Sequence, residues 1–403
     1  MQDKQINIIQ FMPYFPPHKW WVETVWQEIA NYWTEKGYWN FINVITEFEQ
    51  EKILNNKIDM QPIIYESEVI WYTKDWYDVI VMPSLEIINN FPIYKFWTKK
   101  YKVINRYLKD EIWEDKNNFR VITHTRFFLT SLIWWIFAKK NKLKWIHIEH
   151  WSDYVKLSSK LKTKLSIIYD KIFWKWIFKK ADKLLAISNA CKEFINNEFI
   201  KRDVEIFYRG LDLPEDLPQV ENLKEKFPWK IIVWFIWRIM KWKNVDSLVK
   251  AYYQLDNVLK DKIQVVIIWD WEDFDTLKQL DTKNRIYFTG WKPFNEALAY
   301  QKQFDIHTHT SSPWWWLATT LLQAMNYWCL IVATPNEWAK EVIENYINWF
   351  LLKNDSVEEI KKWLETALNN FDKKQEFTRI NKQIIQEKFS RNKQIEKLSD
   401  LVK

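Results

Sequence analysis

The chain of 403 residues contains only three glycines, whereas an average usage of about 7% would give roughly 28. Tryptophan shows the opposite bias, with 29 residues. Many of these tryptophans stand between a strand-like and a helix-like segment, where α/β proteins use glycine. Glycine allows positive φ angles and close backbone approach, and an indole side chain allows neither. We therefore expect most of the tryptophans to be glycines in the natural protein.

A single recoded codon accounts for this pattern. UGA is read as tryptophan in some genetic codes and as glycine in a few bacterial ones. Each bulky side chain forced into a tight site costs about 1–3 kcal/mol. About twenty such sites would exceed the roughly 5–15 kcal/mol that stabilises a domain. The alternative is a genuinely aromatic-rich binding protein. We expect Trp33, Trp145 and Trp176, which stand beside charged residues, to be genuine.

Cysteines and long apolar runs are also scarce. Cys191 and Cys329 lie far apart and match no metal or disulfide pattern. No apolar run approaches the 18 or so residues that span a bilayer. The polar start of the chain does not resemble a secretory signal. We therefore expect a cytoplasmic, reduced protein.

The net charge of +7 is compatible with two interpretations. One is simply lysine-rich, solvated helix faces. The other is attraction to an anionic partner such as a nucleotide diphosphate, an acidic lipid surface or a nucleic acid. No nucleic-acid-binding motif accompanies the charge, so we expect no nucleic acid partner. Peripheral contact with an anionic membrane, at the inner face of the cell membrane, remains compatible with the charge.

Short apolar runs alternate with helix-like stretches along the chain, which is typical of a parallel sheet covered by helices. In the first half we expect strands at 6–12, 41–46, 79–83, 121–123, 145–149 and 184–188, and helices over 22–36 and from 189. In the second half we expect strands at 231–236, 264–268, 286–289, 306–308 and 330–333, and helices over 244–255, 273–280 and 319–326.

The fold class predicted from this rhythm is α/β, with two doubly wound Rossmann-like domains facing across a cleft. The predicted boundaries are 1–205 for the first domain, 206–228 for a linker and 229–380 for the second domain. A helix over 381–403 is expected to pack back on the first domain. Open α/β sheets bind ligands at the carboxyl ends of their strands, so we place the site there.

The first motif is HKWWVET, which follows the first expected strand. If Trp20 and Trp21 are glycines, it becomes a glycine-rich turn that opens a helix. Such a turn directs backbone N–H groups and the positive helix end toward an anion. The alternative is an ordinary turn between a strand and a helix.

The second motif runs from Ile231 to Tyr252. With glycine at Trp234 and Trp237, it becomes a strand and a glycine-arginine turn, followed by Lys243 near a helix start. Arg238 and Lys243 would supply a planar fork and a mobile point charge, which suits a diphosphate. The alternative is that both residues form surface ion pairs.

Two further motifs follow strands of the second half. In VVIIWDWEDF, Asp270 between two tryptophans is expected to form or cap a turn. In HTSSPWWWLATT, residues 314–316 would form a loop that enters a helix at Leu317. This helix start would be a second site for a nucleotide diphosphate or a sugar.

Together these motifs resemble the retaining GT-B-fold glycosyltransferases of glycosyltransferase family 4. The resemblance extends from PYFPPHKWWVET to the final helix and includes YRGLD, whose Gly210 matches the turn into the linker. It implies a UDP- or GDP-linked sugar donor bound mainly by the C-terminal domain, and an acceptor bound mainly by the N-terminal domain. It also implies that neither a metal nor a cofactor is needed.

The resemblance assigns roles to individual residues. Catalytic roles fall to His150, Arg238 and Lys243. Donor binding falls to Trp20, Trp21, Trp237, Arg238, Lys243, Trp315, Trp316, Leu317, Gln323 and Glu341. Independently of the resemblance, we expect acceptor binding by His124, which stands at a strand end, and by Glu23, for which the alternative is a solvated position on its helix. The chain departs from the family at Trp315 and Gln323, where a pair of glutamates is usual. Glutamine still hydrogen-bonds a ribose hydroxyl, whereas tryptophan or glycine does not replace a carboxylate.

The expected reaction is sugar transfer to an acceptor hydroxyl with retention of the anomeric configuration. The expected acceptor is a lipid-linked glycan, a cell-surface polysaccharide or a glycolipid. Two alternatives remain: a sugar-nucleotide epimerase of the same fold, and a non-catalytic aromatic carbohydrate-binding protein. The epimerase would act on donor alone, and the binding protein would require all 29 tryptophans to be genuine.

Overall fold

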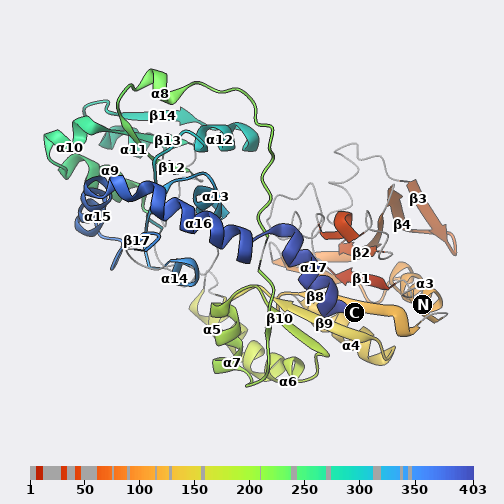
Figure 1. The fold of residues 1–403 in the computed structure, drawn as a ribbon. Coiled ribbons are helices and arrows are strands. Elements are labelled where there is room, and N and C mark those ends of the chain that lie inside the picture. Colours follow the sequence, from red (N-terminus) through yellow and green to blue (C-terminus); the bar gives the residue numbers. More distant parts are fainter. Residues whose placement is uncertain are drawn as a thin grey trace. The chain divides into compact units, whose positions relative to one another are not determined.

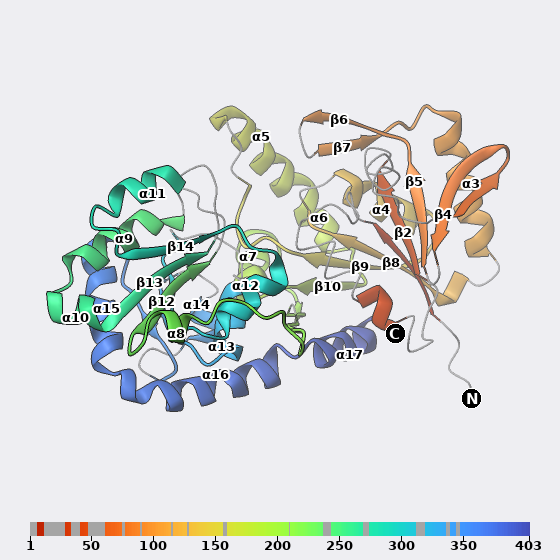
Figure 2. The same cartoon turned by 90° about the horizontal axis from the view of Figure 1, so that it is seen from above.

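The computed structural model divides the chain into two compact units (Figures 1 and 2). One contains Met1–Arg209 with Gln394–Lys403, and the other contains Gly210–Lys393. Within them the structure describes residues 6–11, 29–33, 41–46, 61–74, 77–88, 91–113, 116–126, 129–155, 159–208, 210–236, 243–268, 274–311, 319–335, 339–343 and 347–403. Each unit is built around its own sheet and is described by itself.

The first unit contains a nine-stranded sheet with the order β11-β10-β9-β8-β1-β2-β5-β4-β3. Its strands are β1 (Asn7–Phe11), β2 (Phe41–Thr46), β3 (Gln61–Tyr65), β4 (Glu68–Lys74), β5 (Tyr77–Met82), β8 (Phe119–His124), β9 (Lys144–Glu149), β10 (Lys183–Ala186) and β11 (Glu205–Ile206). All neighbours are parallel except β4, which pairs antiparallel with both β3 and β5. A separate hairpin joins β6 (Ser84–Ile88) and β7 (Phe91–Tyr94).

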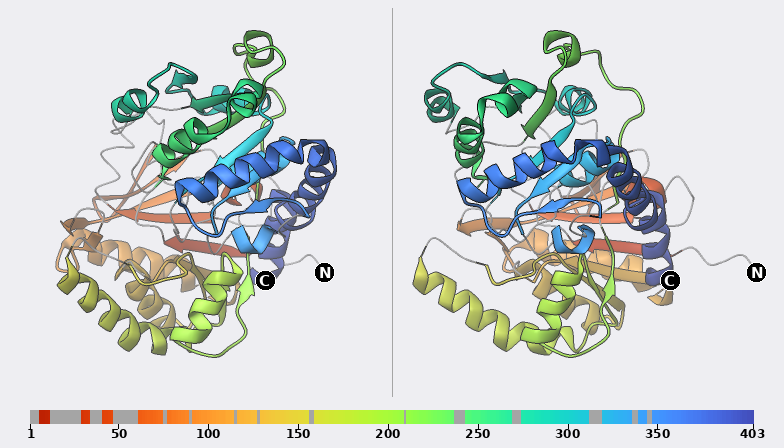
Figure 3. Two further views of the ribbon diagram at one scale, coloured as in Figure 1. Left: turned by 90° about the vertical axis from the view of Figure 1, so that its left-hand side faces the viewer. Right: turned by 60° about the vertical axis from the view of Figure 1, so that its left-hand side comes forward.

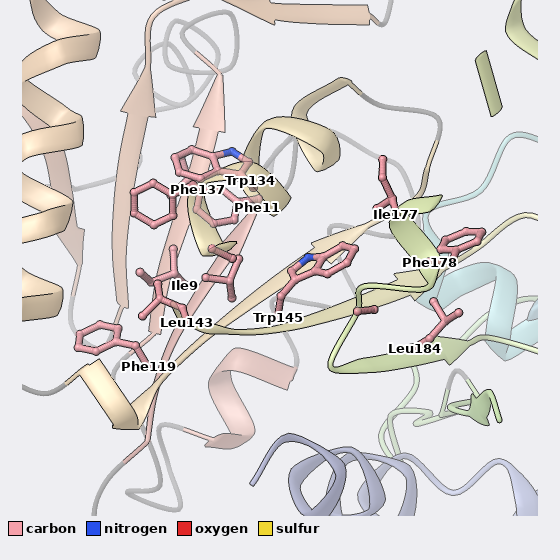
Figure 4. Close-up of a cluster of buried hydrophobic side chains, with 14 of the residues drawn as sticks. Ile9, Phe11, Phe119, Trp134, Phe137, Leu143, Trp145, Ile177, Phe178 and Leu184 are labelled. Atoms are coloured by element: carbon pink, nitrogen blue, oxygen red, sulfur yellow. The ribbon is translucent and has the colours of Figure 1, made fainter. Parts of the chain in front are cut away.

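Of the central strands, β8 is buried along its whole length and β9 at every residue but Lys144, as expected for parallel strands covered on both faces. Helices of this unit are α3 (Lys99–Trp113), α4 (Leu129–Lys140), α5 (Lys160–Tyr169), α6 (Lys175–Phe178) and α7 (Asn189–Glu198), with a π-helical turn η2 (Asp170–Trp174) between α5 and α6. Figure 4 shows part of the core, where the ring of Trp134 on α4 stacks 3.4 Å from that of Phe11 on β1.

The end of the chain belongs to this first unit. Helix α17 (Arg391–Val402) contributes Ser399, which accepts a hydrogen bond from the indole nitrogen of Trp33 at 2.7 Å. The guanidinium of Arg120 on β8 donates to the backbone oxygens of Val402 and Lys403, each at 3.1 Å. The last ten residues are thereby fixed to β8 and to the helix that contains Trp33. The predicted domain boundaries themselves stay a prediction.

The second unit contains a six-stranded, fully parallel sheet with the order β14-β13-β12-β15-β16-β17. Its strands are β12 (Ile231–Ile236), β13 (Ile263–Ile268), β14 (Ile286–Gly290), β15 (Ile306–His309), β16 (Leu330–Ala333) and β17 (Phe350–Leu351). Its helices are α8 (Leu223–Lys226), α9 (Val245–Gln254), α10 (Asn257–Lys262), α11 (Phe274–Leu280), α12 (Phe294–Gln301), α13 (Thr319–Asn326), α14 (Ala339–Val342), α15 (Val357–Asn369) and α16 (Lys374–Lys388). Val233, Leu248, Val265 and Trp363 meet in its core.

Each sheet reverses its strand order at one position. In the first sheet, β1 lies between β2 and β8, and the chain proceeds outward in opposite directions from the β1–β8 pair. In the second sheet the same reversal occurs at the β12–β15 pair. At such a reversal the connections diverge, and the carboxyl ends of the two strands are left open to a ligand.

The α/β class with two Rossmann-like sheets confirms the predicted fold class. The strands at 41–46, 231–236 and 330–333 and the helix at 319–326 have the predicted bounds. Of the helix expected over 22–36, only residues 29–33 are described, and they are helical. The antiparallel edge strands and the β6–β7 hairpin were not predicted. Their described side chains differ in burial, since Ile64 is 66% exposed whereas Ser84 and Tyr94 are buried.

Candidate active site

Two histidines with predicted roles meet in the first unit. His124 ends β8 and His150 directly follows β9, and these strands are parallel neighbours. Their carboxyl ends therefore lie side by side, and the Nδ1 of His124 is 3.2 Å from the Nε2 of His150. Both side chains are buried, and burial lowers the pKa of each, to about 3 for His150. Both rings are therefore neutral near pH 7, and one donates the hydrogen bond that the other accepts.

A buried carboxylate fixes the backbone around His150. One oxygen of Glu149 accepts hydrogen bonds from the backbone N–H groups of His150 and Trp151, each at 3.0 Å. The other accepts from the backbone N–H of Arg126, also at 3.0 Å. The same carboxylate thus holds the backbone after β8 and after β9. It determines where the chain places the two histidines.

Arg126 is the counter-charge of this carboxylate. Its guanidinium lies 3.1 Å from Glu149 and donates from Nε to Asp170 at 3.0 Å. It also lies 4.7 Å from the centre of the Phe194 ring, in a cation–π arrangement. All three charged side chains are almost fully buried. We call Arg126, Glu149 and Asp170 the buried charge cluster.

Arg126 contacts both carboxylates, but the pKa values of Glu149 and Asp170 shift in opposite directions. Burial by itself raises the pKa of Glu149, but the attraction of Arg126 and hydrogen bonding outweigh it and lower that pKa to about 2. For Asp170, burial dominates and the Glu149 charge adds to it, so the pKa rises to about 6. Asp170 opens the π-helical turn η2, a kind of irregularity that is frequent at functional sites.

Sequence analysis did not identify the buried charge cluster. A signal was present, because Glu149 ends the strand KWIHIE and Arg126 comes two residues after the strand FRVITH. A charged residue at that position is either at a ligand site or paired inside the fold. Asp170 offers no such signal. It lies within a lysine-rich helical stretch, and the π-helical turn changes which helix face its side chain is on.

In the second unit, Lys243 lies at the reversal between β12 and β15. Its backbone oxygen accepts a hydrogen bond from the Thr310 hydroxyl at 3.0 Å, and Thr310 directly follows β15. Lys243 is buried, and burial lowers its pKa to about 7. The pKa of His309 is also lowered, first by burial and then by the Lys243 charge. A buried amine at this position is placed to meet an anion.

The remaining described residues of the predicted donor site lie on two helices of the second unit. Gln323 is a buried residue of α13, which packs against β15, β16 and α16. Glu341 lies in the first turn of α14. The predicted site residues Trp20, Trp21, Glu23, Trp237, Arg238, Trp315, Trp316 and Leu317 lie outside the described residues.

The described part of the chain contains no group of three or more His, Cys, Asp or Glu side chains that could hold a metal ion. In that same part, no helix combines the length and apolar character that crossing a membrane requires.

Residues 22–215 match the family model of Glycosyltransferase Family 4, and residues 219–384 match that of Glycosyl transferases group 1. The chain is 36% identical over 409 residues to the uncharacterized glycosyltransferase MJ1069 of Methanocaldococcus jannaschii, and the match covers 97% of each protein. The chain belongs to this glycosyltransferase family. The enzyme class predicted from the sequence, a glycosyltransferase, is therefore confirmed.

Solved glycosyltransferase structures share the fold. HepE of Anabaena, in complex with UDP, is 13% identical with a TM-score of 0.68, and the match covers 98% of this chain and 99% of that one. Sucrose-phosphate synthase of Thermosynechococcus elongatus is 12% identical with a TM-score of 0.70, and 98% of each chain is covered. At these identities the similarity establishes the GT-B architecture, with two Rossmann-like sheets.

Proposed function

We propose that this glycosyltransferase moves a sugar, a hexose, from a UDP- or GDP-linked donor to an acceptor hydroxyl with retention of configuration. The observation that carries the proposal is the buried Lys243 at the β12–β15 reversal. A cation at the carboxyl ends of parallel strands suits a diphosphate. In support, the HepE protein of the same fold was solved with UDP-glucose.

The chemistry follows from where charge develops. As the bond from the sugar to the diphosphate breaks, negative charge grows on the leaving phosphate. Lys243 and Arg238 would stabilise that charge, which lowers the barrier without a metal ion. The leaving phosphate would take the proton of the acceptor hydroxyl. His150, neutral because of its burial, would donate or accept a hydrogen bond to the sugar or the acceptor, with His124 orienting its ring.

We further propose that the acceptor is a lipid-linked glycan, a glycolipid or a cell-surface polysaccharide, and that the enzyme works in the cytoplasm in contact with an anionic membrane. A TarM variant of S. aureus, solved in complex with fondaparinux, alpha-GlcNAc-glycerol and UDP, is 13% identical to this chain with a TM-score of 0.61. The net charge of +7 supports attraction to an anionic surface.

A screen of nucleotide sugars tests the function. The purified protein is incubated with each UDP- and GDP-linked sugar, and release of the free nucleotide is measured with and without EDTA. We expect slow release from one donor, unaffected by EDTA and accelerated by the correct acceptor, and a product whose anomeric proton coupling matches that of the donor. Conversion of the donor alone to its epimer, or no turnover of any donor, would contradict the proposal.

We also propose that the natural protein carries glycine at most of the printed tryptophans. Trp328 supports this, because it follows α13 with a φ of 61°. The N–H of Cys329 donates to the oxygen of Ala324 at 3.2 Å, which makes Trp328 the C′ residue of a Schellman motif. That position is most often glycine, since a left-handed backbone costs other residues about 1–2 kcal/mol. Trp229, with a φ of 65°, is fully exposed in a turn before β12.

Buried indoles give a second line of support. The indole N–H groups of Trp33 and Trp145, which we expect to be genuine, donate to Ser399 and Thr123 at 2.7 and 2.9 Å. The buried indole N–H of Trp234, which we interpret as glycine, has no nitrogen or oxygen acceptor within the described parts. The ring stacks on Phe304 and packs at a tilt against His307. Its hydrogen-bonding contact is with the thiol of Cys329, and sulfur is a weak acceptor, so the burial of this N–H is poorly compensated.

Peptide masses of the protein from its natural source decide the decoding. We expect tryptic peptides that contain positions 229, 234 and 328 to have the masses given by glycine. The peptide with Trp145 should retain the mass given by tryptophan. Tryptophan masses at all four positions would refute recoding while leaving the glycosyltransferase assignment intact.

A further inference from the structure

Residues 160–178 form a helical segment made of α5, η2 and α6 (Figure 2). This segment carries an unusual exposed surface. Its exposed large apolar residues are Leu161, Leu165, Ile168, Ile172, Phe173 and Trp176. Leu161 is 67% exposed and Ile172 is 62% exposed. Helix α5 contains no buried residue at all. An isolated helix of this length is marginal in water, so a surface that covers it would stabilise it.

The apolar side chains form one stripe along the segment. Leu161, Leu165, Ile168, Ile172 and Trp176 recur at intervals of four, three, four and four residues. This spacing places them on one helix face, which the π-helical turn shifts only locally. We call these five residues the apolar stripe. In Figure 3 the yellow-green segment that carries it runs along the outside of the first unit.

Lysines run beside the apolar stripe. Lys160, Lys164, Lys171 and Lys175 each precede one of its members, so they form an adjacent row along the helix. Lys162 follows Leu161, and Lys179 and Lys180 follow the last turn. The only acidic residue in the segment is Asp170, which is buried against Arg126. Lys171 also pairs with Glu198 at 3.6 Å, and the remaining lysines make the surface cationic as well as apolar.

A cationic hollow adjoins the end of the segment. Lys175 and Lys179 line it together with Lys201 and Arg202, and its volume is about 520 Å³. Arg202 is held in place, since it donates to the backbone oxygens of Phe178 and Ala181 at 2.8 and 3.1 Å. The hollow adds positive charge beside the end of the helical segment.

We propose that residues 160–178 bind the surface of an anionic lipid bilayer, with the apolar stripe inserted at the boundary between headgroups and acyl chains. This inference rests on the membrane contact proposed above and assigns it to one segment. An amphipathic helix with lysines beside a bulky apolar face has this chemistry. A second copy of the chain would bring two lysine rows together, and this repulsion disfavours self-association through the same face.

Vesicle binding by the full-length protein tests the inference. We expect co-sedimentation with vesicles of phosphatidylcholine and phosphatidylglycerol, little with phosphatidylcholine alone, and a decrease at high salt. Substituting Leu165→Ser together with Lys164→Glu should weaken binding about tenfold or more, because it removes an inserted side chain and reverses a charge. The control, Val258→Ser with Lys262→Glu, likewise replaces one exposed apolar residue and one lysine on the exposed helix α10, and it should bind like the wild type.

Three outcomes would overturn the inference. The first is that the wild type fails to bind anionic vesicles, and the second is that the segment variant binds them as well as the control does. The third is that the wild type is a dimer and the segment variant is a monomer. Nucleotide release, measured with a water-soluble acceptor, distinguishes this test from the test of the function. A segment variant that releases nucleotide normally but no longer binds vesicles supports the assignment of the membrane surface to this segment. If no protein releases nucleotide, the proposed reaction is contradicted, and the vesicle result still decides the membrane proposal.

Discussion

The Nδ1 of His124 lies 3.2 Å from the Nε2 of His150, although the two residues come from different strands. A shared hydrogen bond makes the orientation of each ring depend on the other. Glu149 accepts a hydrogen bond from the backbone N–H of His150, and Arg126 pairs with Glu149. The buried charge cluster therefore fixes the backbone that carries His150. This arrangement leads to the first prediction.

We expect His124→Asn and His150→Asn each to lower kcat/KM about tenfold or more, and the double variant to lose little beyond the worse single variant. Residues that share a hydrogen bond show such non-additivity. Burial keeps the pKa of His150 near 3, so the rate should not change between about pH 5 and about pH 7 through these rings. Additive losses, or an inflection near the usual histidine pKa that His150→Asn removes, would contradict this role.

Lys243 should make nucleotide binding depend on pH. Its pKa is about 7 in the free protein because of burial, and only the protonated amine attracts a diphosphate. Rising pH therefore removes the attractive charge, and UDP or GDP affinity should fall between about pH 7 and about pH 9. The terminal phosphate is already ionised in this range, since its second pKa is near 6.

Calorimetric titration with both nucleotides checks this prediction. Lys243→Gln should weaken binding of the preferred nucleotide about tenfold at pH 7 and remove the pH dependence. Lys250→Gln changes an exposed lysine of α9 that pairs with Asp246, and it should leave both unchanged. A Lys243→Gln protein with wild-type affinity for both nucleotides would rule out the assigned role.

Arg126→Met should destabilise the protein strongly. The substitution leaves the carboxylates of Glu149 and Asp170 buried without their cation, and removing one partner from a buried ion pair costs about 3–5 kcal/mol. Arg106→Met removes an exposed arginine that pairs with Glu66 in the same unit, and it should change the stability little because solvent screens this pair. Urea unfolding followed by circular dichroism measures both, and equal midpoints for the two variants would be the contrary result.

Two buried tryptophans should respond in opposite ways to glycine. Trp145→Gly removes a side chain that is bonded to Thr123 and leaves a cavity, so we expect a loss of about 3–5 kcal/mol. Trp234→Gly removes an indole whose N–H has no nitrogen or oxygen acceptor among the described residues, at a position we interpret as natural glycine. We expect a higher soluble yield and a higher unfolding midpoint. A comparable loss in both variants would count against recoding at position 234.

The strands that carry the site were the most predictable part of the fold. Parallel strands buried on both faces appear as continuous apolar runs, which is why residues 231–236 and 330–333 were located to the residue. The antiparallel strand β4 and the hairpin of β6 and β7 lack this pattern. Their formation depends on pairing with distant segments, for which a single sequence gives no sign.

The site could be predicted only as far as its strand ends. His124 was proposed because it stands at a strand end and Lys243 because it stands near a helix start, whereas His150 was proposed because it matches a histidine of the family that the chain resembles. That His124 and His150 touch required knowing that β8 and β9 are neighbours in register. Asp170 was unpredictable, because it reaches Arg126 across 44 residues of sequence from within a π-helical turn.

Gly210 is one of the three printed glycines, and the structure explains its presence. A methyl group on it would lie 2.2 Å from the Cα of Arg391, so the two backbones cross in direct contact. Leu211 donates to Phe389 at 2.7 Å just beyond this crossing, and Tyr208 donates to Gln394 at 3.1 Å just before it. The two chain segments that connect the units, at residues 208–211 and 389–394, are therefore in direct contact with each other. An alanine at position 210 would therefore force the backbone at Arg391 to move, and it would strain the hydrogen bonds on either side of the crossing.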